Sequence, residues 1–379
     1  MVVEARHLFR GCRLRIDLDE GTVRTEFGPA PAALSAVPEW IFCPPLIDLQ
    51  VNGGFGIDLQ DPELAEPDFW MLCEKLAGQG VAAWLPTLIT DDIRALNRKI
   101  ARLGEWIRKW RDMPTGRGGA CPLGIHLEGP FISPEDGARG AHPREHVMPP
   151  SPAVFDQLHA SAGGMIRCVT LAPEVPGGLD LIQHIRDRYP AVLIGIGHTL
   201  ADGETIQEAV RAGARISTHL GNGLPVMLYR HRNPLWAQLA DPGLCASLIP
   251  DLHHLPPEAL RAFLSAKGAR HTVFVSDAVC LAGQPPGTYS LFGAEVEKKA
   301  DGRVCLKGTE LLAGSGTMLL EGLIRAVNSG VLSLETAWEG GSRVPAALLD
   351  CAEYVAPFST GGTVQNGILL RQEGGGNQP

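Results

Sequence analysis

The fold is decided by residues 192–223, VLIGIGHTLADGETIQEAVRAGARISTHLGNG, which read as a strand, a helix and a second strand. The runs Val192–Gly197 and Ala214–Leu220 are almost continuously apolar, as expected for parallel strands that are buried on both faces. Between them, Asp202–Ala212 has the pattern of a helix with an acidic first turn, and it ends at Gly213. This stretch therefore predicts one strand–helix–strand unit of an α/β fold.

The same alternation continues in both directions along the chain. Six further apolar runs have the length of buried strands: Leu46–Val51, Val81–Leu88, Pro122–Leu127, Ile166–Ala172, Leu244–Ile249 and Thr272–Ser276. Helical patterns lie between them, for example at Asp91–Trp110 and Pro256–Lys267. Eight such repeats over about 300 residues predict a (β/α)8 TIM-type barrel. A doubly wound open sheet is the structural alternative.

Two flanking regions do not fit the repeat. Residues 1–45 contain short alternating strands broken by turns, and residues 351–379 contain a further strand–turn–strand pattern. Together they predict a small β-sandwich domain that is built from both termini. The barrel is then expected to occupy residues 46–350.

Composition and charge exclude several classes of partner. The 33 Lys and Arg residues and 42 Asp and Glu residues leave a net charge of −9, with no basic tract, so nucleic acid is not an expected partner. No apolar run approaches the roughly 20 residues that a membrane helix needs. The nine cysteines form no Cys-x-x-Cys pair, and the chain does not open with a signal-peptide pattern. These features favour the cytoplasm, with free thiols.

Groups that bind metals stand at the ends of several predicted strands. Glu128 follows the third strand, His198 the fifth and His219 the sixth. Taken separately, each has a structural alternative, either a carboxylate that caps a turn or a histidine with a purely structural role. In a barrel, however, the carboxyl ends of the strands surround one active site. Two imidazoles and one carboxylate then form the ligand set of a catalytic divalent metal with an open position for water.

Asp277 follows the eighth strand and should point toward the same axis. Beside a metal-bound water it could take a proton and later donate it to a leaving amine. A further metal ligand or a simple turn residue is the alternative for this position.

Loops after other strands carry weaker candidates. Ala141 and His142 lie after the third strand, where His142 could reach a substrate. Two histidines follow the seventh strand, and we expect at least one of them to face the pocket, with His254 open to solvent. The segment Leu312–Gly316 precedes a helical stretch, where free backbone N–H groups could hold an anionic or hydroxyl group. An ordinary helix cap is the alternative there.

Seven short motifs together resemble one enzyme family. They are Ile47–Gly54, His126–Phe131, Gly140–His142, Gly197–Thr199, Thr218–Asn222, Ser276–Ala278 and Leu312–Ser315. They occur in family order over roughly residues 45–330. On these motifs the chain resembles the amidohydrolase superfamily and, within it, the N-acetylglucosamine-6-phosphate deacetylase family.

The resemblance implies a barrel with a small β domain and a divalent metal, zinc in the first place and iron or manganese otherwise, held by Glu128, His198 and His219. It implies that Asp277 acts as general base and then as general acid, on an amino-sugar substrate, in a homodimer. It further implies contacts with the sugar and its acetyl group from Ala141, His142, Asn222, Gly223, His253, Leu312, Ala313 and Gly314.

The chain also departs from the family pattern. Gln50 and Asn52 stand where two-metal members of the superfamily carry His-x-His, and amides are poor ligands for zinc or iron, so we expect one metal. The segment Val226–Trp236 is longer than the family's phosphate-contacting stretch, which leaves both Arg230 and Arg232 as candidates for that contact. A related N-acetylhexosamine or an N-acyl amino acid is the alternative substrate, and a non-catalytic sugar-binding protein is the alternative function.

Overall fold

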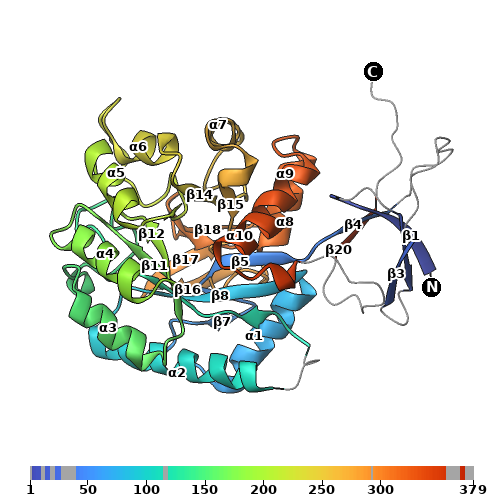
Figure 1. The fold of residues 1–379 in the computed structure, drawn as a ribbon, viewed down its shortest axis with the longest axis horizontal. Coiled ribbons are helices and arrows are strands. Elements are labelled where there is room, and N and C mark those ends of the chain that lie inside the picture. Colours follow the sequence, from blue (N-terminus) through green and yellow to red (C-terminus); the bar gives the residue numbers. More distant parts are fainter. Residues whose placement is uncertain are drawn as a thin grey trace.

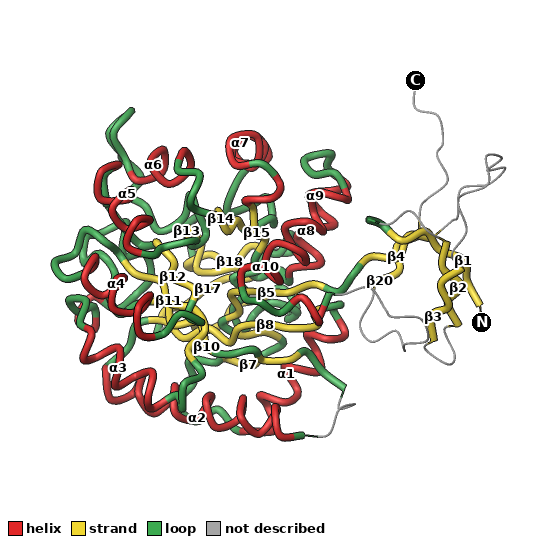
Figure 2. Tube along the Cα trace, viewed as in Figure 1, coloured by secondary structure: helices red, strands yellow, loops and turns green. Residues whose placement is uncertain are grey.

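A computed structural model describes residues 2–9, 13–17, 22–26, 40–113, 118–291, 293–355 and 368–371. Eight parallel strands form one curved sheet in the order β15-β14-β13-β12-β11-β10-β8-β5, which is a nearly closed barrel (Figures 1 and 2). Their bounds are β5 Leu46–Val51, β8 Val81–Ile89, β10 Ile125–Glu128, β11 Ile166–Leu171, β12 Leu193–Ile196, β13 Ile216–Ser217, β14 Cys245–Leu248 and β15 Thr272–Phe274. All eight predicted strands are confirmed. The third is preceded by a separate short strand, β9 Cys121–Pro122.

Helices surround this sheet on the outside, as Figure 2 shows in red. They are α1 Glu66–Gly78, α2 Ile93–Asp112, α3 Pro152–Ser161, α4 Gly178–Arg188, α5 Gly203–Ala212, α6 Pro234–Ala240, α7 Pro257–Lys267, α8 Leu319–Asn328, α9 Leu334–Trp338 and α10 Val344–Leu348. The helix predicted from Asp202 is α5, and Asp202 caps it by accepting the N–H of Thr205 at 2.9 Å. The helix predicted before Gly268 is α7.

The barrel closes between its first and eighth strands without a regular ladder. Instead, the Asp277 N–H donates to the Gln50 carbonyl at 3.0 Å, and the Asn52 N–H donates to the Ala278 carbonyl at 2.8 Å. Below these bonds, Oδ1 of the buried Asp48 accepts the N–H of Ser276 at 3.1 Å. A side-chain carboxyl therefore replaces part of the missing ladder and ties the two strands together inside the barrel.

A four-stranded antiparallel sheet follows the eighth barrel strand, and the sequence patterns did not predict it. It consists of β16 Gly287–Leu291, β17 Ala294–Lys298, β18 Arg303–Leu306 and β19 Leu312–Ser315. Its buried side chains include Leu291, Val296 and Val304. The stretch Leu312–Ser315 does precede a helix, α8, as expected, but it is itself a strand and not a turn. It is an edge strand, and a backbone bridge between Ser315 and Ala278 joins it to the closing seam of the barrel.

The terminal segments meet in a five-stranded sheet of order β20-β4-β1-β2-β3, to the right of the barrel in Figure 1. Its strands are β1 Val2–His7, β2 Arg13–Asp17, β3 Thr22–Glu26, β4 Trp40–Cys43 and β20 Ile368–Arg371. Ala5, Leu14, Ile16 and Phe42 form its buried core. A separate domain of residues 1–45 and 351–379, and its sandwich form, remain predictions, because parts of both segments lie outside the described residues.

Asp48 generates a testable pH dependence of stability. Burial raises the pKa of this carboxyl to about 7, although hydrogen bonds from Ser276 oppose the shift. Because the folded-state pKa lies above the unfolded one, wild-type stability should fall as the pH rises toward and through about 7, by up to a few kcal/mol. Asp48→Asn cannot ionise, so its melting temperature relative to wild type should rise between about pH 5 and about pH 8.

Asp180→Asn, at an exposed position in α4, is the matched control and should show the pH dependence of the wild type. A pH dependence of Asp48→Asn that parallels the wild type would contradict this role.

Candidate metal centre and active site

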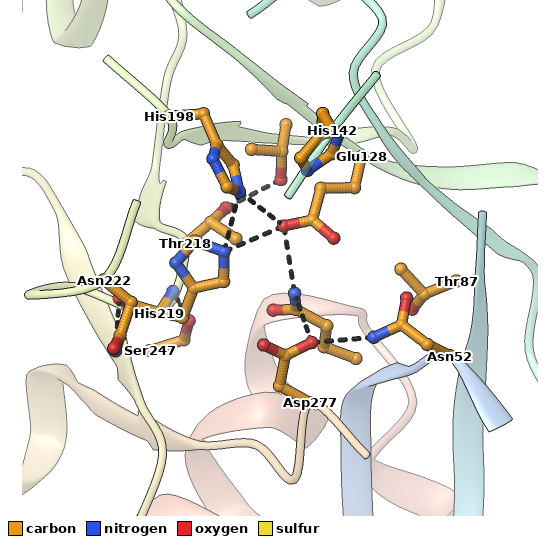
Figure 3. A network of polar contacts seen from close by, with 12 residues as sticks. Asn52, Thr87, Glu128, His142, His198, Thr218, His219, Asn222, Ser247 and Asp277 are labelled. Carbon is orange, nitrogen blue, oxygen red and sulfur yellow. Dashed lines mark hydrogen bonds and ion pairs between the residues drawn. The ribbon is translucent and has the colours of Figure 1, made fainter. Parts of the chain in front are cut away.

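A cavity of about 200 Å³ opens at the carboxyl ends of the barrel strands. Glu128 is the last residue of β10, and His198 and His219 each lie two residues beyond the end of β12 or β13. Asn52 and Asp277, from the closing seam, complete the floor (Figure 3). The barrel therefore brings the predicted metal ligands and the predicted proton-transfer residue to one enclosed place.

Three of these residues leave their strands with a left-handed backbone. The φ angles are 50° at His198, 31° at His219 and 48° at Asp277. This conformation is uncommon for residues other than glycine and costs about 1–2 kcal/mol at each position. It turns each side chain from the strand direction toward the barrel axis. Such strain at three converging side chains is a sign of a functional site.

Gly197 shows why a glycine precedes His198. A Cβ atom at this position would lie 2.8 Å from both Thr170 Cγ2 and Thr218 Cβ on the neighbouring strands. Gly197 therefore allows the chain that follows β12 to pass closely between these two threonines just before His198.

Glu128, His198 and His219 offer three ligand atoms within 4.8 Å of one another. Glu128 Oε1 lies 3.1 Å from His198 Nε2 and 2.8 Å from His219 Nε2, and the two imidazole nitrogens are 3.0 Å apart. His198 Nδ1 lies 2.8 Å from the Ala138 carbonyl, which only accepts, so the proton of the neutral ring is on Nδ1. Its Nε2 therefore points a lone pair at the other two atoms.

This arrangement fits a metal ion better than it fits a hydrogen-bond network. Two imidazole nitrogens and one carboxylate oxygen, all atom types that divalent metals prefer as ligands, converge at one buried place, and a cation there would bind all three. Burial alone would raise the pKa of Glu128, but its contacts with His198 and His219 outweigh burial and hold that pKa well below the usual value. The carboxyl is therefore ionised, which is the form that binds a cation.

Asp277 is held by two amides on β5 and just beyond it. Its Oδ1 accepts from Gln50 Nε2 at 3.0 Å and from Asn52 Nδ2 at 2.7 Å. The same Gln50 nitrogen lies 3.1 Å from Glu128 Oε1, so this amide sits between the two carboxylates. Burial, followed by the nearby charge of Glu128, raises the pKa of Asp277 to about 6. With Oδ1 engaged twice, Oδ2 is the oxygen that remains for proton transfer.

His142 lines the opposite side of the cavity. Its Nδ1 lies 2.8 Å from Thr90 Oγ1 and accepts the Thr90 N–H at 3.4 Å. Burial, with a smaller effect from His198, lowers the pKa of His142 to about 3, so the ring is neutral. Since Nδ1 is an acceptor, Nε2 carries the proton, and the ring offers an N–H donor for a ligand.

The other predicted contact residues divide into two groups. Those that line the cavity are Ala141, His142, Asn222, Gly223, Leu312 and Gly314. Ala313 does not line it, because it alternates with Leu312 and Gly314 along β19 and packs into the core of the inserted sheet. Gln50 lies behind the cavity wall, in contact with Asp277 and Glu128.

The two histidines after β14 take the reverse of their expected positions. His254 lines the cavity, and its Nδ1 lies 2.7 Å from Asp251 Oδ2. His253 turns away, and its Nε2 lies near the Asp301 carbonyl and Arg325. The expectation that His254 faces solvent was therefore wrong. The spacing of Asp251 and His254, three residues apart just before α7, was the available signal in the sequence. A carboxylate at this spacing can hold the imidazole ring in a fixed orientation toward the cavity.

Arg230 and Arg232 are exposed and are not among the residues that line the cavity. They belong to a segment whose apolar side chains are also exposed, with 95% of Val226, 85% of Met227 and 85% of Tyr229 accessible. Within this chain the structure does not place either arginine against the substrate cavity.

The geometry predicts the metal stoichiometry. Wild-type protein prepared with a divalent metal should bind about one ion per chain, and His219→Ala should lose it because one of three ligands is gone. His254→Ala is the matched control, since this ring lines the same cavity outside the ligand set. Elemental analysis of the purified proteins measures the difference. Full metal content in His219→Ala, or loss of metal in His254→Ala, would overturn the assignment.

Comparisons with known proteins point to one family. No protein-family model matches the chain. The N-acetylglucosamine-6-phosphate deacetylase of Bacillus subtilis (strain 168) is 32% identical over 303 residues, which cover 79% of this chain and 74% of that protein. The N-acetylgalactosamine-6-phosphate deacetylase of Escherichia coli O157:H7 is 32% identical over 330 residues, covering 84% of this chain and 83% of that protein.

A solved structure supports the same fold. It is N-acetyl-D-glucosamine-6-phosphate deacetylase from Mycobacterium smegmatis in complex with N-acetyl-D-glucosamine-6-phosphate. The TM-score is 0.78 at 23% sequence identity, over 98% of this chain and 95% of that chain. Because these relatives are 32% identical over most of the chain, the chain belongs to the N-acetylglucosamine-6-phosphate deacetylase family of the amidohydrolase superfamily.

Proposed function

We propose that this protein hydrolyses the acetamide of N-acetylglucosamine 6-phosphate to give glucosamine 6-phosphate and acetate. The observation that carries the proposal is the convergence of Glu128, His198 and His219 within 4.8 Å, with Asp277 in the same cavity, in a chain of this family. A non-catalytic sugar-binding protein would need neither this ligand set nor an aspartate poised beside it.

We propose that Glu128, His198 and His219 hold one divalent ion, with zinc as the first choice and iron or manganese as the alternatives, because two imidazoles and one carboxylate suit all three. Gln50 supports a single ion, because its amide nitrogen is engaged with both Glu128 and Asp277 and an amide would be a poor ligand for zinc or iron. When bound, the ion lowers the pKa of a water molecule and polarises the acetamide carbonyl.

The role proposed for Asp277 follows from its fixed orientation. Gln50 and Asn52 hold Oδ1, so Oδ2 takes the proton from the attacking water and then donates it to the departing amine. The His142 Nε2–H donates to an oxygen of the substrate, and its ring is oriented for this by Thr90. Ala141, Asn222, Gly223, Leu312 and Gly314 form the walls around the acetyl group and the sugar.

Removal of the proton acceptor at Asp277 tests the mechanism. Asp277→Asn keeps the shape but cannot take a proton, so kcat should fall by roughly 10²–10⁴-fold while the metal content stays at the wild-type level. Asp180→Asn, at an exposed position in α4, is the control and should keep both. Wild-type turnover in Asp277→Asn would refute the assignment, and loss of metal would instead make Asp277 a ligand.

The identity of the sugar is tested by a substrate panel. We expect N-acetylglucosamine 6-phosphate to have the highest kcat/KM, and N-acetylgalactosamine 6-phosphate is the second candidate because the second relative acts on it. The unphosphorylated sugars and an N-acetyl amino acid complete the panel, with acetate release as the measurement. If the amino-acid amide is the best substrate, the proposed function fails although the metal centre is retained.

We further propose a homodimer, supported by the exposed apolar side chains of Val226, Met227 and Tyr229. Because Arg230 and Arg232 lie on the same segment and away from this chain's cavity, a phosphate contact by either would have to come from a second copy. Sedimentation analysis measures the assembly, and Arg230→Gln and Arg232→Gln in the substrate panel measure the contact.

A cytoplasmic location is also a proposal. In the described part of the chain, no helix is long and apolar enough to cross a membrane. The eight cysteines described there are all free, and most are buried, which is typical of proteins in a reducing compartment. Cell fractionation measures the location.

A further inference from the structure

A second and larger cavity, of about 650 Å³, lies at the amino-terminal end of the barrel strands, opposite the metal centre. Its walls come from the start of β12 at Val192–Ile194, from the end of α4 and the loop after it, and from the end of α10. The catalytic cavity measures only about 200 Å³. The two cavities therefore lie at opposite ends of the same strands, and the larger one has no part in the proposed reaction.

Three arginines from three different elements line this second cavity. Arg167 lies on β11, Arg186 on α4, and Arg215 just before β13. Asp350 is the single acidic residue in the lining, so the lining has a net charge of +2. In a chain with a net charge of −9, such a concentration of positive charge is a local exception.

Backbone carbonyls hold these guanidinium groups in place. Arg167 Nη2 donates to the Leu349 carbonyl at 2.6 Å, and Arg215 Nη1 donates to the carbonyls of Val210 and Ala214 at 3.0 and 2.8 Å. Arg186 Nη1 donates to the Ala212 carbonyl at 2.9 Å. Anchored arginines have lost part of their side-chain entropy already, so less is lost when they bind a ligand.

The positive charge is only partly balanced within the chain. Arg186 pairs with its neighbour Asp187 at 2.7 Å. Among the described residues, neither Arg167 nor Arg215 forms an ion pair with a carboxylate, and Arg167 Nε is buried without a hydrogen-bond partner. Fixed guanidinium groups without counter-ions favour an anion with several acceptor oxygens, and phosphate is the best match to their geometry.

The rest of the cavity wall is apolar, and it suggests which chemical group the bound phosphate would carry. Val192, Leu193, Leu348 and Leu349 give the cavity an apolar side. A phosphate monoester carries a charge of about −1.5 to −2 at neutral pH, which is opposite in sign to the net charge of the lining. The apolar side then suits a flat or hydrophobic group joined to that phosphate.

We propose that this cavity binds a nucleoside monophosphate, with the phosphate held by Arg167, Arg186 and Arg215 and the base packed on the apolar wall. The site is separate from the catalytic cavity and independent of the deacetylase reaction. Nothing in this inference requires the substrate assignment to be correct.

Ala347→Glu tests the proposal directly. Ala347 lines the cavity from an exposed position on α10, so a glutamate there adds a negative charge without burying it in the core. AMP should bind the full-length, metal-loaded protein in isothermal titration calorimetry, and Ala347→Glu should weaken this binding about tenfold or more. Arg215→Gln should weaken it similarly. Ala262→Glu, at an exposed position on α7, is the matched control and should bind AMP like the wild type.

Two further measurements identify the site and the group recognised. Adenosine, which lacks the phosphate, should bind much more weakly than AMP, and His219→Ala should keep wild-type affinity for AMP because the metal centre is at the other end of the barrel. The proposal is overturned if AMP does not bind at millimolar concentration, if Ala347→Glu binds it unchanged, or if His219→Ala abolishes binding, since the last result would place AMP in the catalytic cavity.

Discussion

The hydrogen bonds that join the first barrel strand to the segment after the eighth set the geometry of the site. The Asp277 N–H donates to the Gln50 carbonyl, while the side chains of Gln50 and Asn52 donate to the Asp277 carboxylate. Gln50 and Asp277 are thus joined both by a backbone hydrogen bond and by a side-chain hydrogen bond. A barrel that opened at this seam would separate Asp277 from its amide partners and from Glu128, so closure of the barrel also places the residue that we propose for proton transfer.

The positions of the proposed metal ligands depend on a different constraint, which is the backbone conformation at the strand ends. His198 and His219 both adopt positive φ, whereas Glu128 continues its strand. The strain is opposed by local bonds, among them the His219 N–H donated to Ser247 Oγ at 2.7 Å. The two imidazole rings therefore face one another because hydrogen bonds and packing from the neighbouring strands hold the backbone of His198 and His219 in place.

Much of this was predictable from the sequence, for identifiable reasons. Buried parallel strands are continuous apolar runs, and the polar residue directly after such a run must lie at one end of the barrel. Glu128, His198, His219 and Asp277 could therefore be assigned together, although each one alone was ambiguous. The seven motifs then led to the family, which the sequence comparisons confirm.

The remaining features were not predictable because strand alternation does not apply in loops. Leu252 has a φ of 61°, and this turn exchanges the directions of His253 and His254. The inserted sheet β16–β19 is largely polar on its outer face, so its strands lacked the long apolar runs by which the barrel strands were found. Arg230 and Arg232 lie in an exposed segment without helix or strand periodicity, so the sequence does not indicate whether either side chain points toward the cavity.

The pairing of β4 with β20 has a consequence for the order in which the protein forms. Ile368 pairs with Cys43 and Arg371 with Trp40, and β4 runs almost directly into β5. On the ribosome, the strands of the barrel emerge from first to last, yet β4 meets this partner only after residues beyond 368 have left the exit tunnel. The terminal sheet is thus completed only after the barrel sequence has been translated, although β4 can pair with β1 on its other side before that.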